Sequence, residues 1–317
     1  MHFFLPDKSI KDMLEMSFET IAEAVNVKLN VPKGTPYSFY DSPYIGHRKT
    51  TAVDIYFKDR EALLPVNEAK VKEIRWFNAP KYRDDGWERE PLILFEINEN
   101  IVLKILHVNP KVNVGEKLSL GDFIGECIVS GYLCPWSDSH AHFEIRPSKD
   151  PYRARGAYTL SIEPTVSKIK NICQVKSNTF TIVEIKKHYI WVKPHYRESS
   201  YLTPLTTKIG NIIGYVDAGV PHYGMGGVIF KNNVSDKITE GNEVKCNSSS
   251  LGYVVIINPL SVLFIAPIEV FINGRKVRGI GTYINGEYLK VIPIEKEPWK
   301  EGDEILLETR IAGLSKW

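Results

Sequence analysis

Cysteines are few in this sequence, long apolar runs are absent, and the charges almost cancel. There are 4 cysteines among 317 residues, and no two of them form a C-x-x-C pair. No stretch approaches the ~20 consecutive apolar residues that a membrane-spanning helix requires. The formal net charge is +2, from 40 Lys and Arg against 38 Asp and Glu. We therefore predict no membrane span, no nucleic-acid partner, and reduced thiols at Cys127, Cys134, Cys173 and Cys246.

A secretory signal is also missing from the first residues. Met1 to Asp7 reads MHFFLPD, which reaches a charge too soon to hold the apolar segment of a signal peptide. We expect a cytoplasmic protein on this ground, and export by another route stays open.

Residues 9–25 carry the spacing of an amphipathic helix. Apolar side chains recur there near the 3.6-residue period, at Ile10, Met13, Leu14, Phe18, Ile21 and Val25. From Val25 to Val31 apolar and polar residues alternate instead, which is typical of a half-buried strand. The pattern predicts an N-terminal helix packed on a β-rich body, with a partner-binding helix as the alternative.

Strand patterns fill most of the remaining chain. Further strands are predicted over residues 52–57, 68–77 and 91–107, the last as a hairpin. Beyond about residue 165 short strands and turns continue, with hairpin signals at Asn273-Gly274 and Asn285-Gly286. At roughly 150 residues per domain the length corresponds to about two domains. We predict a mainly β protein, with one domain over residues 1–160 and a second, all-β accessory domain over residues 161–317.

Two histidines two positions apart open one strand-like run of the first domain. The run reads Ser139-His140-Ala141-His142-Phe143-Glu144-Ile145. Alternate side chains of a strand share a face, so His140, His142 and Glu144 point one way and the apolar residues the other. Neutral imidazole is the commonest metal ligand and a frequent general base. An edge strand with two solvated histidines is the plain alternative.

An aspartate and two further histidines stand out in the same domain. Asp54 lies inside the apolar run Ala52 to Phe57. Aspartate is depleted in strands, and a metal or a hydrogen-bonded neighbour would account for it there. His47 precedes Asp54, and His107 ends the strand pattern that starts at Ile101.

The order of these pieces resembles the lysostaphin-type zinc endopeptidases, which cleave cell-wall peptides in bacteria. Ala52-Val53-Asp54-Ile55 is similar to the family's strand with the metal-binding aspartate. Leu106-His107-Val108 and the glycine-punctuated stretch up to Gly125 are similar to its central strand and the turn after it. His140 to Arg146 is similar to its H-x-H strand. The resemblance covers residues 40–150 and implies a β-hybrid or sandwich fold, the duplicated hybrid motif, for the first domain.

The resemblance also implies roles for individual residues. His47, Asp54 and His142 would bind zinc, and His140 and His107 would lie beside the metal as acid–base or transition-state groups. Three protein ligands leave a zinc position for water, whose pKa falls to about 7. A neighbouring histidine can take the water's proton and later protonate the leaving amine. The expected function is a zinc-dependent, endopeptidase-like hydrolase acting on short peptide bonds.

The chain departs from the family's pattern near His47. The family places this histidine four residues before the aspartate, whereas here the gap is seven, and the usual intervening glycine is absent. Seven residues of straight strand would span about 23 Å at about 3.3 Å each. His47 and Asp54 can therefore share a metal only if residues 48–51 make a turn or bulge. Enzymes that cut cell walls must also be exported, and no export signal is seen.

Other functional readings stay open at this stage. A binding or assembly protein could keep the scaffold, and even the metal, without hydrolysis. The glycine turn alone also resembles biotin- and lipoyl-carrier domains, but no lysine occupies a hairpin tip in their setting. In the second domain, His188, His195 and His222 are expected to be ordinary surface or structural residues. A protein partner could bind there through aromatic side chains that we expect to be exposed, at Tyr196, Tyr201, Tyr223, Tyr283 and Tyr288.

Overall fold

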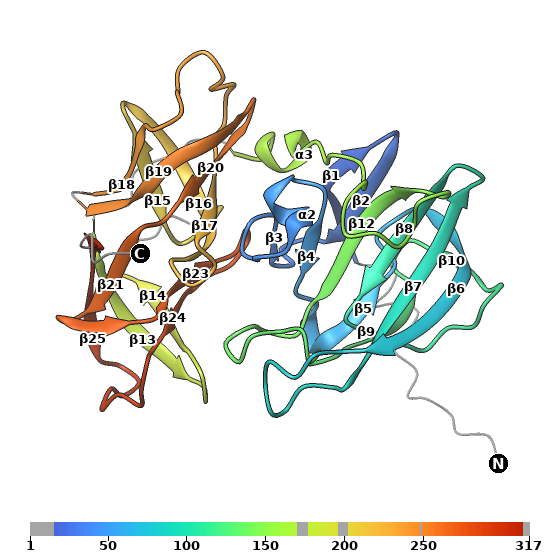
Figure 1. Ribbon diagram of the computed structural model, residues 1–317, viewed down its shortest axis with the longest axis horizontal. Coiled ribbons are helices and arrows are strands. Elements are labelled where there is room, and N and C mark those ends of the chain that lie inside the picture. Colours follow the sequence, from blue (N-terminus) through green and yellow to red (C-terminus); the bar gives the residue numbers. More distant parts are fainter. Residues whose placement is uncertain (1–15, 170–176, 196–201, 248, 313–317) are drawn as a thin grey trace.

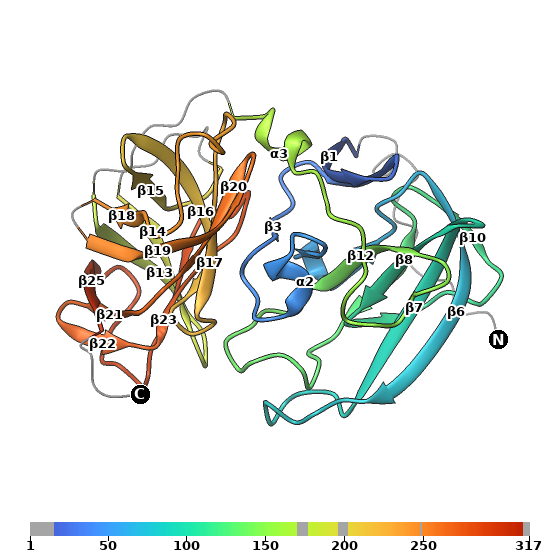
Figure 2. The same cartoon turned by 45° about the horizontal axis from the view of Figure 1, so that its top comes forward.

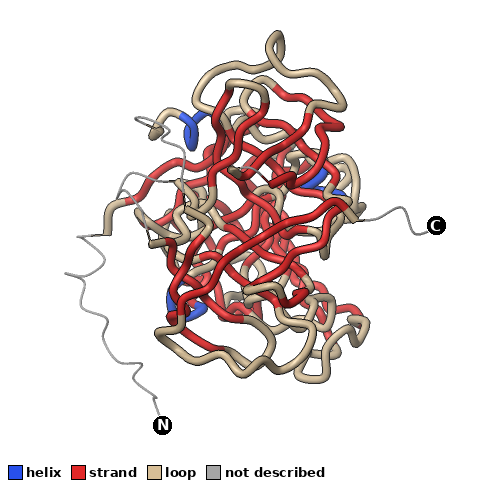
Figure 3. Tube along the Cα trace, turned by 90° about the vertical axis from the view of Figure 1, so that its left-hand side faces the viewer, coloured by secondary structure: helices blue, strands red, loops and turns tan. Residues whose placement is uncertain are grey.

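The computed structural model describes residues 16–169, 177–195, 202–247 and 249–312, and these are mainly β (Figure 3). The helical pieces in these ranges are short: α2 (Ile45–Arg48), the 3₁₀ turn η1 (Lys58–Arg60) and α3 (Glu163–Val166). None of the described helices has the length and apolar character needed to cross a membrane. The predicted mainly β fold class is confirmed.

The predicted N-terminal helix is wrong where the structure describes it. Phe18–Ala24 forms strand β1, which pairs with β2 (Val27–Pro32), and residues 9–15 lie outside the described residues. A β-bulge between Thr20 and Ala22 shifts the strand register, so Ile21 and Ala22 are both buried. This shift breaks the two-residue alternation and produces the spacing that resembles a helix period. Val25 and Asn26 close the hairpin, both with positive φ.

The main sheet of the N-terminal half (residues 16–169) has seven antiparallel strands. The sheet order is β10-β6-β7-β8-β12-β4-β3. The H-x-H strand β12 lies near the middle, between β8, which ends just before His107, and β4, which contains Asp54. In sheet order the strands are β10 (Lys117–Ser119), β6 (Glu68–Asn78), β7 (Arg89–Asn98), β8 (Ile101–Leu106), β12 (Ala141–Pro147), β4 (Val53–Ile55) and β3 (Tyr37–Ser38).

A small three-stranded sheet accompanies the main one. Its order is β5 (Glu61–Leu63), β11 (Phe123–Cys127) and β9 (Val108–Pro110). Both sheets and the β1–β2 hairpin place apolar side chains in one buried cluster, which includes Leu29, Phe95, Ile124 and Phe143. The apolar face of β12 is therefore fixed in this core, and its histidine face is turned the other way.

The C-terminal half (residues 177–312) is built on a thirteen-stranded antiparallel sheet. Six of its strands, β15-β18-β19-β20-β17-β16, form a closed ring because β15 pairs with both β18 and β16. In sheet order the strands are β15 (Thr206–Ile209), β18 (Glu243–Cys246), β19 (Ser249–Asn258), β20 (Ser261–Ile265), β17 (Met225–Ile229), β16 (Ile212–Val220), β23 (Gly279–Thr282), β24 (Leu289–Ile292), β14 (Ile190–Pro194), β13 (Thr179–Ile185), β25 (Glu304–Ile311), β21 (Ile268–Ile272) and β22 (Arg275–Val277).

The two halves meet along β3 and α2. Both elements lie on the side of the N-terminal half that faces the C-terminal half (Figures 1 and 2). Tyr37 of β3 forms a β-bridge with Ile284, and Tyr215, Ile229 and Leu263 of the C-terminal half belong to the apolar cluster of the N-terminal half. This contact matters for function, because α2 carries His47.

Candidate metal centre

A short helical turn brings His47 back to Asp54. The backbone N–H of Thr51 donates to the Gly46 carbonyl at 2.8 Å, and Thr50 takes a φ of 53°, so the chain reverses after α2. A Cβ at Gly46 would lie 2.9 Å from the Cβ of Ala52, so the reversal needs a glycine there. As a result, His47 Nε2 lies 3.3 Å from Asp54 Oδ1 in spite of the seven-residue gap. The turn required by the spacing is present.

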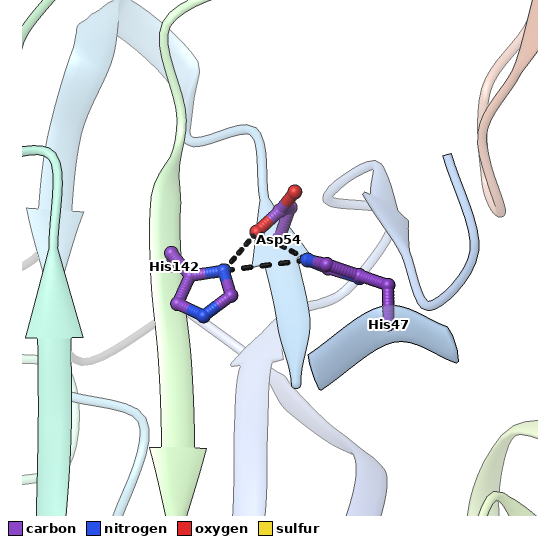
Figure 4. Close-up of side chains that lie close together, drawn as sticks. All are labelled: His47, Asp54 and His142. Atoms are coloured by element: carbon purple, nitrogen blue, oxygen red, sulfur yellow. Dashed lines mark hydrogen bonds and ion pairs between the residues drawn. The ribbon is translucent and has the colours of Figure 1, made fainter. Parts of the chain in front are cut away.

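Asp54 lies at the centre of the site. It occupies the middle of β4, in register with His142 of β12, and it is 2 % exposed. Its Oδ1 is 2.7 Å from His142 Nδ1, and His142 Nδ1 is 3.3 Å from His47 Nε2. One nitrogen or oxygen atom from each of His47, Asp54 and His142 lies within 4.8 Å of the others (Figure 4). The structure therefore brings together the three residues that the sequence proposes as metal ligands.

In His47 and His142, the ring nitrogen farther from Asp54 is held by an oxygen acceptor. His47 Nδ1 lies 2.8 Å from the carbonyl oxygen of Phe39, which can only accept, so Nδ1 carries the proton. His142 Nε2 lies 3.1 Å from Glu144 Oε1. In the neutral rings this leaves His47 Nε2 and His142 Nδ1, the two atoms nearest Asp54, without a proton. Metal-binding histidines usually have their second nitrogen fixed in this way.

Glu144 is itself held by cations. Lys104 Nζ donates to it at 2.9 Å, Arg146 donates through Nη1, and Tyr44 donates its hydroxyl proton at 3.3 Å. Burial alone would raise the pKa of Glu144, but its hydrogen bond to His142 and the charges of His142 and Lys104 lower the pKa to about 2. The carboxylate is therefore charged at neutral pH and holds the His142 ring in place.

His107 and His140 lie beside this group. Their ring centroids are 5.2 Å apart, and the His107 and His142 centroids are 6.1 Å apart. His140 Nε2 lies 3.4 Å from Asp54 Oδ2, while its Nδ1 is 2.8 Å from the Asp138 carbonyl oxygen. The five residues His47, Asp54, His107, His140 and His142 are called the histidine cluster below.

His107 is fixed by a carboxylate. Its Nδ1 lies 2.9 Å from Glu90 Oε1, and the same oxygen accepts the backbone N–H of His107 at 2.6 Å. Ser130 donates its hydroxyl proton to Glu90 Oε2. These bonds hold His107 in a left-handed backbone conformation, with a φ of 66°, at the end of β8. Strain of this kind is typical of functional positions.

Charge in the cluster is set by competition between burial and close partners. Burial would raise the pKa of Asp54, but the charges of His140 and His47 and the hydrogen bond to His142 lower it well below its usual range. Burial lowers the pKa of His140 to about 4, against the attraction of Asp54. Burial would also lower the pKa of His142, but hydrogen bonds to Asp54 and Glu144 raise it to about 9. Asp54 is therefore charged at neutral pH, and it favours a positive charge on its neighbours, either on His142 or on a bound cation.

The cluster opens into a cleft of about 590 Å³. Asp54, His107, His140 and His142 line it, together with residues of the C-terminal half. Its walls are strongly aromatic, with Tyr44, Tyr56, Phe77, Tyr82, Tyr132, Trp136, Tyr152, Tyr223 and Tyr283. A cleft of this size takes a small molecule or a few residues of an extended chain.

Some expectations for the C-terminal half need correction. Tyr283 is 5 % exposed and lines the cleft with Tyr223, so these two are not surface aromatics; Tyr196 and Tyr201 lie outside the described residues. His222, expected to be an ordinary surface or structural residue, also lines the cleft.

The cysteines were expected to be reduced thiols. Cys127, Cys134 and Cys246 are free thiols in the structure, and Cys173 lies outside the described residues.

Sequence reasoning missed most of the residues that support the cluster. Glu90 and Lys104 could have been found from the sequence, because each is a charged residue within or next to an apolar strand pattern. The structure shows that both side chains are buried. The Phe39 and Asp138 carbonyl groups carry no such signal, since any residue type could supply them.

Comparisons with known proteins find two matching family models, one in each half of the chain. No curated protein and no solved structure matches the chain. Two family models do match, one described as the Domain of unknown function (DUF8155) N-terminal domain and the other as the DUF8155 C-terminal domain. The two matches, over residues 28–162 and 174–310, are thus to the N-terminal and C-terminal domains of one family, DUF8155.

Proposed function

We propose that the chain is a zinc-dependent hydrolase that cleaves amide bonds of peptides, similar to the lysostaphin-type endopeptidases. One observation carries the proposal. Each of the four histidines of the cluster has one ring nitrogen bonded to an oxygen acceptor, namely the Phe39 or Asp138 carbonyl or the Glu90 or Glu144 carboxylate. The other nitrogen of each neutral ring is left to accept a proton or bind a metal.

The donor set of His47, Asp54 and His142 fits zinc. Two imidazole nitrogens and one carboxylate oxygen are a common catalytic zinc environment, whereas Mg²⁺ and Ca²⁺ prefer oxygen ligands. All three residues are buried, and their ligand atoms lie within 4.8 Å of one another. Bound zinc would lower the pKa of a coordinated water and polarise a carbonyl group.

His140 is suited to act as the general base. Its Nδ1–H is fixed on the Asp138 carbonyl oxygen, so its Nε2 is the nitrogen that can take a proton. This atom faces Asp54 Oδ2 at 3.4 Å, so it lies next to the proposed metal position. His140 Nε2 can take the proton of the attacking water and later give it to the leaving amine.

His107 is suited to face negative charge. Glu90 accepts the proton of His107 Nδ1 at 2.9 Å, and a carboxylate in this position orients the ring. When its ring carries a second proton, His107 Nε2 can donate toward the oxygen on which charge develops when the amide carbonyl is attacked. The His107–Glu90 pair therefore complements His140 rather than repeating its role.

The experiment is a hydrolysis assay with the full-length protein. Short glycine- and alanine-rich peptides are incubated with zinc-loaded protein and the products are read by mass spectrometry. We expect cleavage by the unaltered protein and by His195→Ala, whose histidine lies outside the cleft. We expect loss of cleavage after zinc removal by a chelator and its return with added zinc.

A second outcome has its own meaning. If zinc-loaded protein binds peptides of the panel but cleaves none of them, the hydrolase proposal fails. The binding or assembly protein that keeps the scaffold would then be the better account.

A further inference from the structure

A buried carboxylate of the cleft wall is not used by the mechanism above. Asp41 follows β3, is 8 % exposed, and lines the same cleft as Asp54 and His140. Its Oδ1 is buried and has no hydrogen-bond partner among the described residues. A carboxylate buried without a partner is costly, and such groups gather at functional sites.

The loop that carries Asp41 is fixed from both halves. The backbone N–H of Asp41 donates to Ser38 Oγ at 2.7 Å, and Ser38 Oγ donates to Asp217 Oδ1 at 2.6 Å. The hydroxyl of the neighbouring Tyr40 lies 2.8 Å from Ser261 Oγ. The position of Asp41 is thus determined by bonds that leave its own carboxylate unused.

Two glycines of the C-terminal half make room for this carboxylate. A Cβ at Gly219 would lie 2.0 Å from Asp41 Oδ1, and a Cβ at Gly281 would lie 3.2 Å from Asp41 Oδ2. Gly219 has an ordinary backbone angle, so its lack of a side chain is explained by the close approach of Asp41. The strands β16 and β23 therefore accommodate an acidic group at this point of the cleft.

The nearby lysine is already paired. Lys290 Nζ donates to Asp138 Oδ2 at 2.5 Å, to the Tyr283 hydroxyl at 2.5 Å and to the Trp136 carbonyl at 3.0 Å. These three bonds use all three of its protons. His222 supplies no charge either, because burial and the charges of Lys290 and Arg278 lower its pKa to about 3. Burial raises the pKa of Asp41 well above its usual range, against the attraction of Lys290, so a cation bound beside Asp41 would favour its charged form.

The surrounding rings are suited to a cation. Tyr56 stacks on Tyr283 with centroids 4.2 Å apart, and Tyr56 lies 5.3 Å from the His140 ring. The Tyr223 ring lies next to Asp41 at Gly219. Aromatic faces attract ammonium groups, most strongly where water is excluded. These rings also connect the surroundings of Asp41 to the histidine cluster.

We propose that Asp41 binds a primary ammonium group of the substrate in the cleft beside the histidine cluster. The substrate class is then a peptide with a free N-terminus or a lysine side chain near the bond to be cleaved. This inference rests on the proposed function for the statement that the ligand is a substrate. The ammonium subsite itself does not depend on hydrolysis.

Binding of three peptides to the full-length protein tests the subsite. The probes are triglycine amide, its N-acetyl analogue, and N-acetyl-Gly-Lys-Gly amide, measured by calorimetry at pH 7. We expect the first, the third or both to bind about tenfold or more tightly than the uncharged analogue. Tighter binding of triglycine amide would identify the ammonium group as a peptide N-terminus, and tighter binding of the lysine peptide would identify it as a lysine side chain. Mass spectrometry of the same samples reports cleavage, so failure of hydrolysis and failure of the subsite are read separately.

Two variants complete the test. Asp41→Asn should abolish the preference for charged peptides and keep the weak binding of the acetylated one, while Asp236→Asn, an exposed aspartate away from the cleft, should change neither. Equal or undetectable binding of all three peptides by the unaltered protein would overturn the proposal. A preference that survives in folded Asp41→Asn would do the same. The comparison on unaltered protein decides the question even if the variant fails to fold.

Discussion

Asp217 of the C-terminal half accepts a hydrogen bond of 2.6 Å from Ser38 Oγ of β3. The other oxygen of Asp217 accepts the backbone N–H of Phe39 at 2.7 Å, and the Phe39 carbonyl accepts the proton of His47 Nδ1 at 2.8 Å. Asp217 therefore helps to orient His47, a proposed metal ligand, through the backbone of Phe39. The C-terminal half is part of the site's framework, in addition to lining the cleft.

The first prediction concerns Asp217 and pH. Burial raises the pKa of Asp217 to about 7, against its three hydrogen bonds, whereas in the unfolded chain the pKa is about 3.9. The folded state holds this proton more tightly, so the contribution to stability is full below about pH 4 and is lost as the pH rises through about 7. Asp217→Asn keeps the size of the side chain and one oxygen that can accept the two backbone N–H groups of Phe39 and Tyr40, and it does not titrate.

Melting temperatures measured from pH 4 to pH 8 check this prediction. The melting temperature of Asp217→Asn minus that of the unaltered protein should increase from pH 4 to pH 7 and level off above. A difference that stays constant over this range would show that Asp217 titrates normally in the fold.

The second prediction concerns the support of His142. Glu144→Gln keeps the size of the side chain but weakens the bond to His142 Nε2. Mutation of the residue that hydrogen-bonds a metal-binding histidine usually lowers metal affinity by about 10–100-fold, so the zinc affinity of this variant should fall by that factor. Competition with a chromophoric chelator measures it, and Glu99→Gln, at an exposed hairpin turn, is the control. Unchanged zinc affinity in Glu144→Gln would mean that His142 does not need this partner.

The third prediction separates the two histidines of the H-x-H strand. His140→Ala should keep its zinc and lose turnover by about 10²–10⁴-fold, the usual contribution of one proton-transfer group. His142→Ala should lose the metal. Zinc content and hydrolysis rate are measured on the same preparations. Loss of zinc from His140→Ala, with retention in His142→Ala, would reverse the assigned roles.

The fourth prediction concerns Lys290, which is 2 % exposed. Lys290→Met leaves Asp138 without its cation, and removing one partner of a buried pair costs about 3 kcal/mol or more of unfolding free energy. Lys276→Met breaks a pair with Glu269 that is largely exposed, and should cost less than about 1 kcal/mol. Urea denaturation of both variants gives the comparison. Equal, small losses would show that the Lys290–Asp138 pair does little to hold the two halves together.

Much of the fold could be predicted from local patterns. Strands β2, β4, β6, β7, β8 and β12 lie where alternation and turn residues predict them. The error at residues 18–24 has a local cause, since the bulge at Thr20–Ala22 buries two neighbouring side chains. A register shift of this kind depends on the partner strand, and the partner strand cannot be read from the segment itself.

The site was predictable only in part, for a related reason. His140, His142 and Asp54 stand out because polar residues in apolar strands need a partner. Asp41 and Asp217 do not stand out, because the groups that surround them lie more than 170 positions away in the sequence, as for the bond between Asp217 and Ser38. The cleft is formed by both halves of the chain, and no local pattern reports how the halves meet.

Zinc content is the most direct test of the central claim that His47, Asp54 and His142 bind a metal. The zinc content per chain is measured by elemental mass spectrometry on protein purified without chelator. Asp54→Ala, His142→Ala and the control His195→Ala are measured in the same way. We predict one zinc per chain in the unaltered protein and in His195→Ala, and loss of zinc from the other two variants. Full zinc occupancy in both Asp54→Ala and His142→Ala, or no zinc in the unaltered protein after zinc is supplied, would contradict the account.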